Sequence, residues 1–142
     1  MQSYLHHLKK LLFFTISLSL ASCSVCSRDI GLQSLATNLM KQSNISDTNV
    51  CSIRYGLLDD GTVGIAEIMP LVQCDITISP FLPPNTEMAV MLHEIGHCVG
   101  LGHVKGYGHI MSISAADERY IKRNWESMVQ GFKNQLRSHR GY

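Results

Sequence analysis

The sequence predicts a small α+β domain, in which a small twisted β-sheet is combined with an N-terminal, a central and a C-terminal helix. Three observations predict this fold class. Apolar residues recur at helical spacing in residues 29–41 and again near the C-terminus. Residues 50–79 instead hold short segments of alternating polarity that are rich in β-branched residues. Prolines and an Asp-Asp-Gly sequence separate these segments.

The first predicted helix spans Asp29 to Lys41. Its apolar residues lie three and four positions apart, so they would form one face of the helix. A polar linker over residues 42–49 follows. The apolar positions are Ile30, Leu32, Leu35, Ala36, Leu39 and Met40.

Three strands are expected after this linker. Residues 50–58 and 62–69 flank the Asp-Asp-Gly sequence, a strong turn signal, so we expect these two strands to form a β-hairpin. In the third strand, over residues 72–79, every second residue is apolar, which predicts one buried face.

Two further helices complete the predicted fold. Asn85 or Thr86 is the expected N-cap of the central helix, with Glu87 in its first turn. Ser114 is the expected N-cap of the last helix. The apolar stripe of this helix is predicted to be core and consists of Ile121, Trp125, Met128, Phe132 and Leu136.

The most informative pattern is His-Glu-Ile-Gly-His-Cys-Val-Gly-Leu-Gly-His at residues 93–103. On a helix, His93 and His97 project from one face about one turn apart and can bind the same ion. Gly100 allows the chain to leave the helix in a left-handed conformation and to return with His103 as a third ligand. Three neutral imidazoles leave one tetrahedral position for water, which is typical of a catalytic zinc site.

Glu94, beside the first ligand, could take the proton of that water. The simplest alternative is a helix with ordinary core histidines, but a buried trio beside a carboxylate would need partners. A second alternative is a zinc-binding surface lipoprotein or interaction module without catalysis, for which Glu94 would have no use. A third takes Glu118 as the last ligand, but His103 fits the spacing better, and Glu118 suits the first turn of the last helix.

This pattern, H-E-x-x-H-x-x-G-x-x-H, resembles the metzincin clan of zinc endopeptidases, whose second hallmark is a methionine turn. Met111, eight residues after His103, resembles that turn as it occurs in the matrixin branch. The resemblance implies a minimal metzincin-like domain with one catalytic Zn²⁺ and an active-site helix. It would hydrolyse peptide bonds in peptides or proteins by a zinc-bound water that Glu94 activates. Ser112 and Ile113 replace the usual Tyr-Pro after the methionine, which changes the expected pocket wall. Some metzincins use a Tyr two residues after the methionine as an extra ligand or oxyanion donor, which Ile113 cannot do, so the expected chemistry rests on Glu94 and the metal alone.

In matrixins an antiparallel edge strand borders the cleft and pairs with extended substrate. Residues 63–67 are similar in place, which implies β-augmentation by Gly64, Ile65 and Ala66. A plain hairpin strand is the alternative. The calcium and second-zinc loop of the family is not recognisable in this sequence.

The first 22 residues resemble a bacterial lipoprotein signal peptide. Their apolar stretch at 11–21 follows two lysines and is too short for a transmembrane helix. Leu-Ala-Ser before Cys23 resembles a lipobox, in which Cys23 receives the lipid after cleavage. The resemblance implies a single peptidase domain over residues 23–142, anchored to a bacterial membrane and facing the periplasm or the cell surface. Secretion after ordinary signal cleavage is the alternative.

Export would place the remaining cysteines in an oxidising compartment, where they can form two disulfides in any of three pairings. Cys98 follows the ligand His97 but lies about 100° around the helix from it, so a disulfide is expected there and not a fourth zinc ligand. The cysteines concerned are Cys26, Cys51, Cys74 and Cys98.

The charge of the exported chain is close to neutral, which argues against general nucleic-acid binding. Without Lys9 and Lys10 the 12 basic residues become 10, against 11 acidic residues, for a formal net charge of −1. We expect a monomer. The last helix holds six basic and two acidic residues, which we interpret as a solvated face, with contact to anionic lipid as the alternative. These are Arg119, Lys122, Arg123, Lys133, Arg137 and Arg140, with Glu118 and Glu126.

Overall fold

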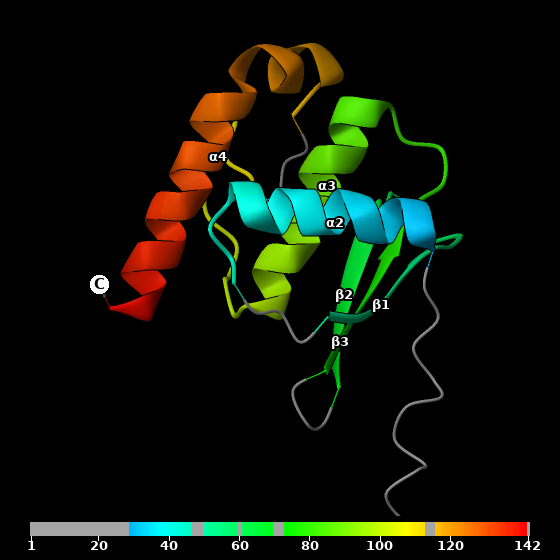
Figure 1. Ribbon diagram of the computed structural model, residues 1–142. Coiled ribbons are helices and arrows are strands. Elements are labelled where there is room, and N and C mark those ends of the chain that lie inside the picture. The colour runs from blue at the N-terminus through cyan, green and yellow to red at the C-terminus, as the bar shows by residue number, and fades with distance from the viewer. Residues whose placement is uncertain (1–28, 47–49, 60, 70–72, 113–115, 142) are drawn as a thin grey trace, which may run out of the picture.

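The computed structural model describes residues 29–46, 50–59, 61–69, 73–112 and 116–141. Within these residues it contains three helices and one three-stranded mixed sheet, which confirms the predicted α+β class (Figure 1). The predicted signal peptide, Cys23 and Cys26 lie outside the described residues. In chain order the elements are α2 (Ile30–Gln42), β1 (Val50–Tyr55), β2 (Gly64–Met69), β3 (Gln73–Ile78), α3 (Pro84–Cys98) and α4 (Glu118–Arg140).

The sheet has the order β1-β3-β2, so the predicted hairpin between the first two strands is wrong. β1 pairs with β3 in parallel, and β2 pairs with β3 in antiparallel orientation. Thr62 N–H donates to Asp59 O at 2.9 Å, but β1 and β2 are not paired with each other. β3 has the burial expected of a central strand, because Cys74, Ile76 and Ile78 are all at most 1% exposed.

Helix α3 is the centre of the domain and contacts α2, α4, β2 and β3. In Figure 1, α2 crosses over α3 while α4 runs along the side of α3 away from the sheet. The core forms where these elements meet, from residues of all three helices and the sheet. Among its members are Leu32, Ala36, Leu39, Ile53, Ile76, Ile78, Met91, Leu92, Ile95, Phe132 and Leu136.

The predicted N-terminal helix is present as α2. The side chain of Asp29 caps it and accepts hydrogen bonds from Gly31 N–H and Leu32 N–H. Its buried residues belong to the predicted apolar face. Ile30 is an exception at 86% exposed, because it is the first residue of the helix and extends beyond the core.

The predicted caps of the two later helices are not those observed. Helix α3 begins after Pro83 and uses no side-chain cap of its own, so Asn85 and Thr86 lie inside its first turn. Asp117 is the N-cap of α4 and accepts from Tyr120 N–H at 2.8 Å. Ser114 lies outside the described residues.

The predicted apolar stripe of α4 faces the core. Four of its five members are at most 5% exposed, and Trp125 packs against the core while partly buried. Among the described residues, no helix is long and apolar enough to cross a membrane.

Candidate metal centre

Three histidine side chains converge at the C-terminal end of α3. His93 and His97 lie one turn apart on the helix, and His103 comes from the loop that follows. Their Nε2 atoms form a nearly equilateral triangle with sides of 3.0, 3.1 and 3.2 Å. Nitrogen ligands of one tetrahedral zinc ion lie roughly 3.3 Å apart, so only slight expansion would be needed.

The second ring nitrogen of two of these histidines bonds to a backbone carbonyl. His93 Nδ1 lies 2.6 Å from Ile110 O, and His97 Nδ1 lies 2.9 Å from Leu101 O. Because a carbonyl only accepts, each Nδ1 carries the proton and each Nε2 keeps a free lone pair. Burial is the main cause that lowers the pKa of His93 and of His97, which favours the neutral form that metals bind.

This donor set fits a metal ion. With Nδ1 of His93 and His97 protonated, their Nε2 atoms lie 3.0 Å apart with lone pairs directed towards each other. A bound cation would relieve the repulsion between these lone pairs. His93, His97 and His103 could therefore hold a metal ion. Imidazole donors suit several divalent metals, of which zinc is one.

The loop that delivers the third ligand begins as predicted. Gly100 has φ +88°, the left-handed conformation that a residue without Cβ adopts at little cost. Leu101 N–H then donates to Gly96 O at 2.9 Å and closes the helix end. Beyond the ligand, Val104 N–H donates to Met111 O at 2.8 Å, which ties the loop to the methionine turn.

Met111 is 1% exposed and packs directly on α3. A Cβ at Gly96 would collide with Met111 Sδ, so the glycine between the two helix ligands makes room for the methionine. Phe132 of α4 approaches the same position to 3.0 Å. The methionine therefore lies against the helical turn that carries His93 and His97.

Glu94 lies between the ligand helix and β2. Its side chain is 5% exposed, and burial raises its pKa to about 7, while a hydrogen bond from the Ala66 N–H opposes this rise. A Cβ at Gly64 would lie 2.7 Å from Glu94 Oε1 and 2.6 Å from Val90 Cγ1. The backbone of β2 therefore packs directly against the carboxylate.

A cleft of about 350 Å³ opens beside these groups. His93, Glu94 and His103 line it together with the start of β2 and an apolar region between α3 and α4. His109 also lines the cleft. The other lining residues are Thr62, Val63, Gly64, Thr86, Ala89, Val90, Ile110, Ser112, Ala116, Ile121 and Met128.

The predicted edge strand, residues 63–67, borders this cleft. β2 lies at one edge of the sheet, antiparallel to β3. Ser79 N–H donates to Val63 O, so the alternating ladder directs the backbone groups of Val63 and Ile65 towards β3. Those of Gly64 and Ala66 point to the open edge, which agrees with the hydrogen bond from Ala66 to Glu94.

A disulfide links Cys74 of β3 to Cys98, the last residue of α3, with a Cα–Cα distance of 5.6 Å. The prediction that Cys98 forms a bridge is thus confirmed, and one of the three possible pairings has been selected. A second disulfide would leave Cys26 with Cys51, which stays a prediction because Cys26 lies outside the described residues.

The sequence analysis did not identify the role of several residues that build the site. The Ile110 and Leu101 carbonyls orient the ligands, but a backbone acceptor leaves no signal in residue type. Gly64 was predicted only as part of the edge strand, and its close approach to Glu94 could have been suspected because a glycine inside a strand often marks close backbone approach. Glu118, the alternative third ligand considered from the sequence, accepts a hydrogen bond from Thr86 N–H at 2.9 Å and lies away from the three histidines.

The chain matches no protein-family model and no curated protein.

Proposed function

We propose that the protein is a zinc-dependent endopeptidase of the metzincin type, close to the matrixins in its methionine turn. The observation that carries the proposal is the position of Glu94. Its carboxylate lines the same cleft as His93 and His103, whereas a site that only binds metal has no use for it. The convergence of three Nε2 atoms and the buried Met111 support the same assignment.

Zinc bound by the three imidazoles would supply Lewis-acid chemistry, polarising the scissile carbonyl and lowering the pKa of water. Glu94 would accept a proton from the attacking water as its oxygen bonds to the carbonyl carbon. The same carboxylate would pass that proton to the amine as the carbon–nitrogen bond breaks. Its contact with β2 fixes the carboxylate for both transfers.

The open edge of β2 suits an extended peptide substrate. Gly64 directs its N–H and carbonyl outward and Ala66 its carbonyl, and these groups could pair with the main chain of a bound peptide. The Ala66 N–H bonds to Glu94 instead. The apolar part of the cleft, which includes Val90, Ile110 and Met128, would accept one apolar side chain next to the cleaved bond.

The N-terminal resemblance leads us to propose a lipid-anchored, exported protein. Acyl chains on Cys23 would hold it at the membrane, since each buried methylene contributes about 0.8 kcal/mol. In the full chain, Cys23→Ser should end incorporation of labelled fatty acid and release the protein. Continued labelling of that variant would contradict the anchor.

The experiment that tests catalysis uses residues 24–142, because the described helices, strands and core all lie in 29–141. The protein loaded with one equivalent of zinc should cleave a mixed peptide library, and a chelator should stop it. Glu94→Gln should retain zinc and lose turnover by on the order of 10³-fold or more. His97→Ala should lose both metal and turnover.

Glu87→Gln is the matched control, because it makes the same chemical change on the same helix at a residue that does not line the cleft. It should remain active. Full zinc loading without cleavage of any peptide would favour the non-catalytic binding module, and an active Glu94→Gln protein would exclude Glu94 as the base.

A further inference from the structure

A second hollow, of about 80 Å³, lies between the end of α2 and the C-terminal half of α4. It shares no lining residue with the cleft at the histidines. Three of its lining residues are basic, and another is Ser43, the C-cap residue of α2. The complete lining is Ser43, Asn44, Lys133, Leu136, Arg137 and Arg140.

The three cations share one face of α4. Lys133, Arg137 and Arg140 are four and three residues apart, which places them on adjacent turns of the same side. None of them forms an ion pair with a carboxylate among the described residues. Arg137 and Arg140 also complement the negative end of the helix dipole, but Lys133 lies before the last turn, and the dipole does not account for it.

Ser43 provides an independent sign of a missing partner. Its side chain is 1% exposed, and its hydroxyl has no hydrogen-bond partner among the described residues. Buried hydroxyl groups are nearly always bonded, and an exception often marks a place where a water or an ion belongs. Here the orphaned hydroxyl lies in a residue that lines the same hollow as three cations.

The charge of the whole domain points in the same direction. Helix α4 carries six basic and two acidic residues, a formal net charge of +4. Residues 23–117 carry four basic and nine acidic residues, a net charge of −5. The resulting field directs anions towards α4 and away from the rest of the domain.

We propose that this hollow binds a phosphate group. Lys133, Arg137 and Arg140 would neutralise its charge through charge-assisted hydrogen bonds, and the Ser43 hydroxyl would donate to one of its oxygens. The group could belong to an anionic phospholipid headgroup or to free phosphate. The site does not depend on zinc or on peptidase activity.

The test uses residues 24–142 and two probes. In the first arm, inorganic phosphate is titrated while the amide resonances of Ser43 and Asn44 are followed by NMR. In the second arm, the protein is sedimented with phosphatidylcholine vesicles that either contain or lack phosphatidylglycerol. Saturable shifts with phosphate support a phosphate site. Additional sedimentation with the anionic vesicles alone, reversed by phosphate, identifies the lipid headgroup as the source.

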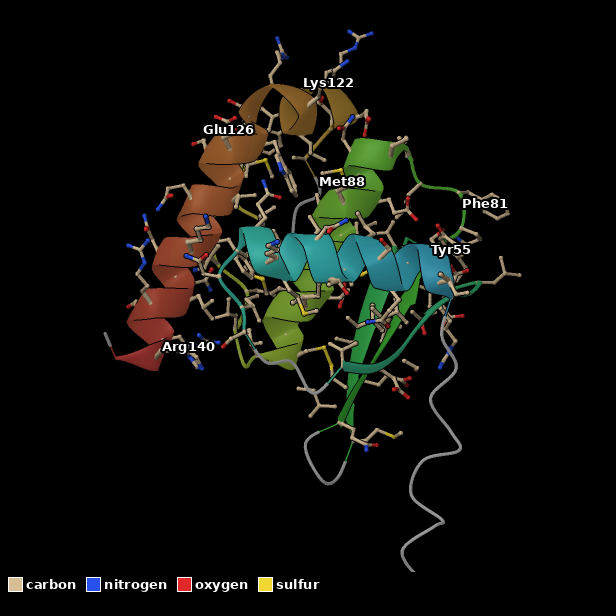
Figure 2. The ribbon with its side chains drawn as sticks, viewed as in Figure 1. Tyr55, Phe81, Met88, Lys122, Glu126 and Arg140 are labelled. Atoms are coloured by element: carbon tan, nitrogen blue, oxygen red, sulfur yellow. A yellow bond between two sulfur atoms is a disulfide. The ribbon has the colours of Figure 1, made fainter. Side chains whose placement is uncertain are left out.

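The variants separate a built site from diffuse charge. Lys133→Gln with Arg137→Gln should weaken binding on the order of tenfold. Arg119→Gln with Lys122→Gln removes the same charge from the other end of α4, as the positions of Lys122 and Arg140 in Figure 2 show, and should change affinity by less than about twofold. Ser43→Ala should weaken binding several-fold without destabilising the free protein, because the hydroxyl has no partner to lose.

Two results would overturn the proposal. The first is the absence of saturable binding to both phosphate and anionic vesicles. The second is an equal loss of affinity in the two double variants together with unchanged binding by Ser43→Ala, which would mean that the total charge of α4 attracts anions without a site.

Discussion

The two ends of α3 are held by different kinds of contact. At its N-terminal end the helix has no side-chain cap of its own, and Glu118 from α4 accepts hydrogen bonds from Thr86 N–H and Oγ1 at 2.9 and 2.8 Å. At its C-terminal end the disulfide between Cys98 and Cys74 fixes the last residue to the sheet. One end therefore depends on an ionisable group, and the other on a covalent bond.

This difference matters because the candidate metal ligands His93 and His97 lie towards the covalently held end. Helix ends fray, and His97 is only one residue from the last residue of α3. The disulfide and the carbonyl of Leu101 limit that fraying, so the imidazole is oriented before metal binds. A fixed ligand set binds metal with a smaller loss of conformational entropy.

The largest effect is expected from removing the covalent contact. Replacing Cys74 and Cys98 by Ala frees a loop with a sequence separation of 24 residues, for which chain entropy predicts a loss of about 3.5 kcal/mol. Urea unfolding at neutral pH should show this loss as a lower midpoint. Zinc affinity should fall with it, because the ligand-bearing turn becomes free to fray.

Reduction provides the control. With Cys26 and Cys51 replaced by Ala in both proteins, so that the predicted second bridge cannot contribute, a thiol reductant should lower the unfolding midpoint to that of the protein also lacking Cys74 and Cys98, and should leave the latter unchanged. Equal midpoints for the oxidised protein and the variant would mean that the disulfide does not hold this end of α3.

The second prediction concerns Glu94, which lies between the two ends and is held by β2. Gly64→Ala would place a Cβ 2.7 Å from Glu94 Oε1, so the carboxylate must move. A displacement of this size should lower kcat on the order of 10²-fold while zinc content stays the same. Kinetics with a cleaved peptide and metal analysis of the same preparation measure both quantities.

Gly102→Ala is the matched control, because a Cβ there meets no atom within 4 Å although the residue adjoins His103. It should retain nearly full activity. Equal kcat values for the two variants would show that the contact between β2 and Glu94 does not position the base.

The same region shows how far the sequence alone could lead. The convergence of the three histidines was predictable because His93, His97 and Gly100 act through helix geometry and a single φ angle, which are local properties. The strand order was not, because pairing depends on which strand is most buried in the finished sheet. The cap of α3 was missed for a similar reason, since Glu118 is distant in sequence from Thr86 and no local pattern connects them.

The third prediction separates the two sides of β2. Ala66→Pro removes an N–H that points to the open edge and bonds to Glu94, so kcat/KM should fall on the order of tenfold with little change in stability. Ile65→Pro removes an N–H that faces β3, so it should lower the free energy of unfolding by about 1 kcal/mol or more. Paired kinetics and thermal unfolding of both variants distinguish the two outcomes. Unchanged kcat/KM in a folded Ala66→Pro protein would argue that the Ala66 N–H does not help to position Glu94.

The smallest effect is expected at the ionisable end of α3. Hydrogen bonds from Asn85 and then Thr86 lower the pKa of Glu118 below its ordinary value. Because the pKa is lower in the folded state, this stabilisation is present above the unfolded pKa and is lost as pH falls through the folded value. Glu118→Gln should therefore unfold more easily than the unaltered protein at neutral pH, and the two should converge in acid. Thermal unfolding across that pH range measures the difference.

Glu126→Gln makes the same change on the exposed side of α4 and should follow the unaltered protein (Figure 2). A constant difference between Glu118→Gln and the unaltered protein at every pH would mean that the Glu118 side chain holds this end of α3 by packing and not by its charge.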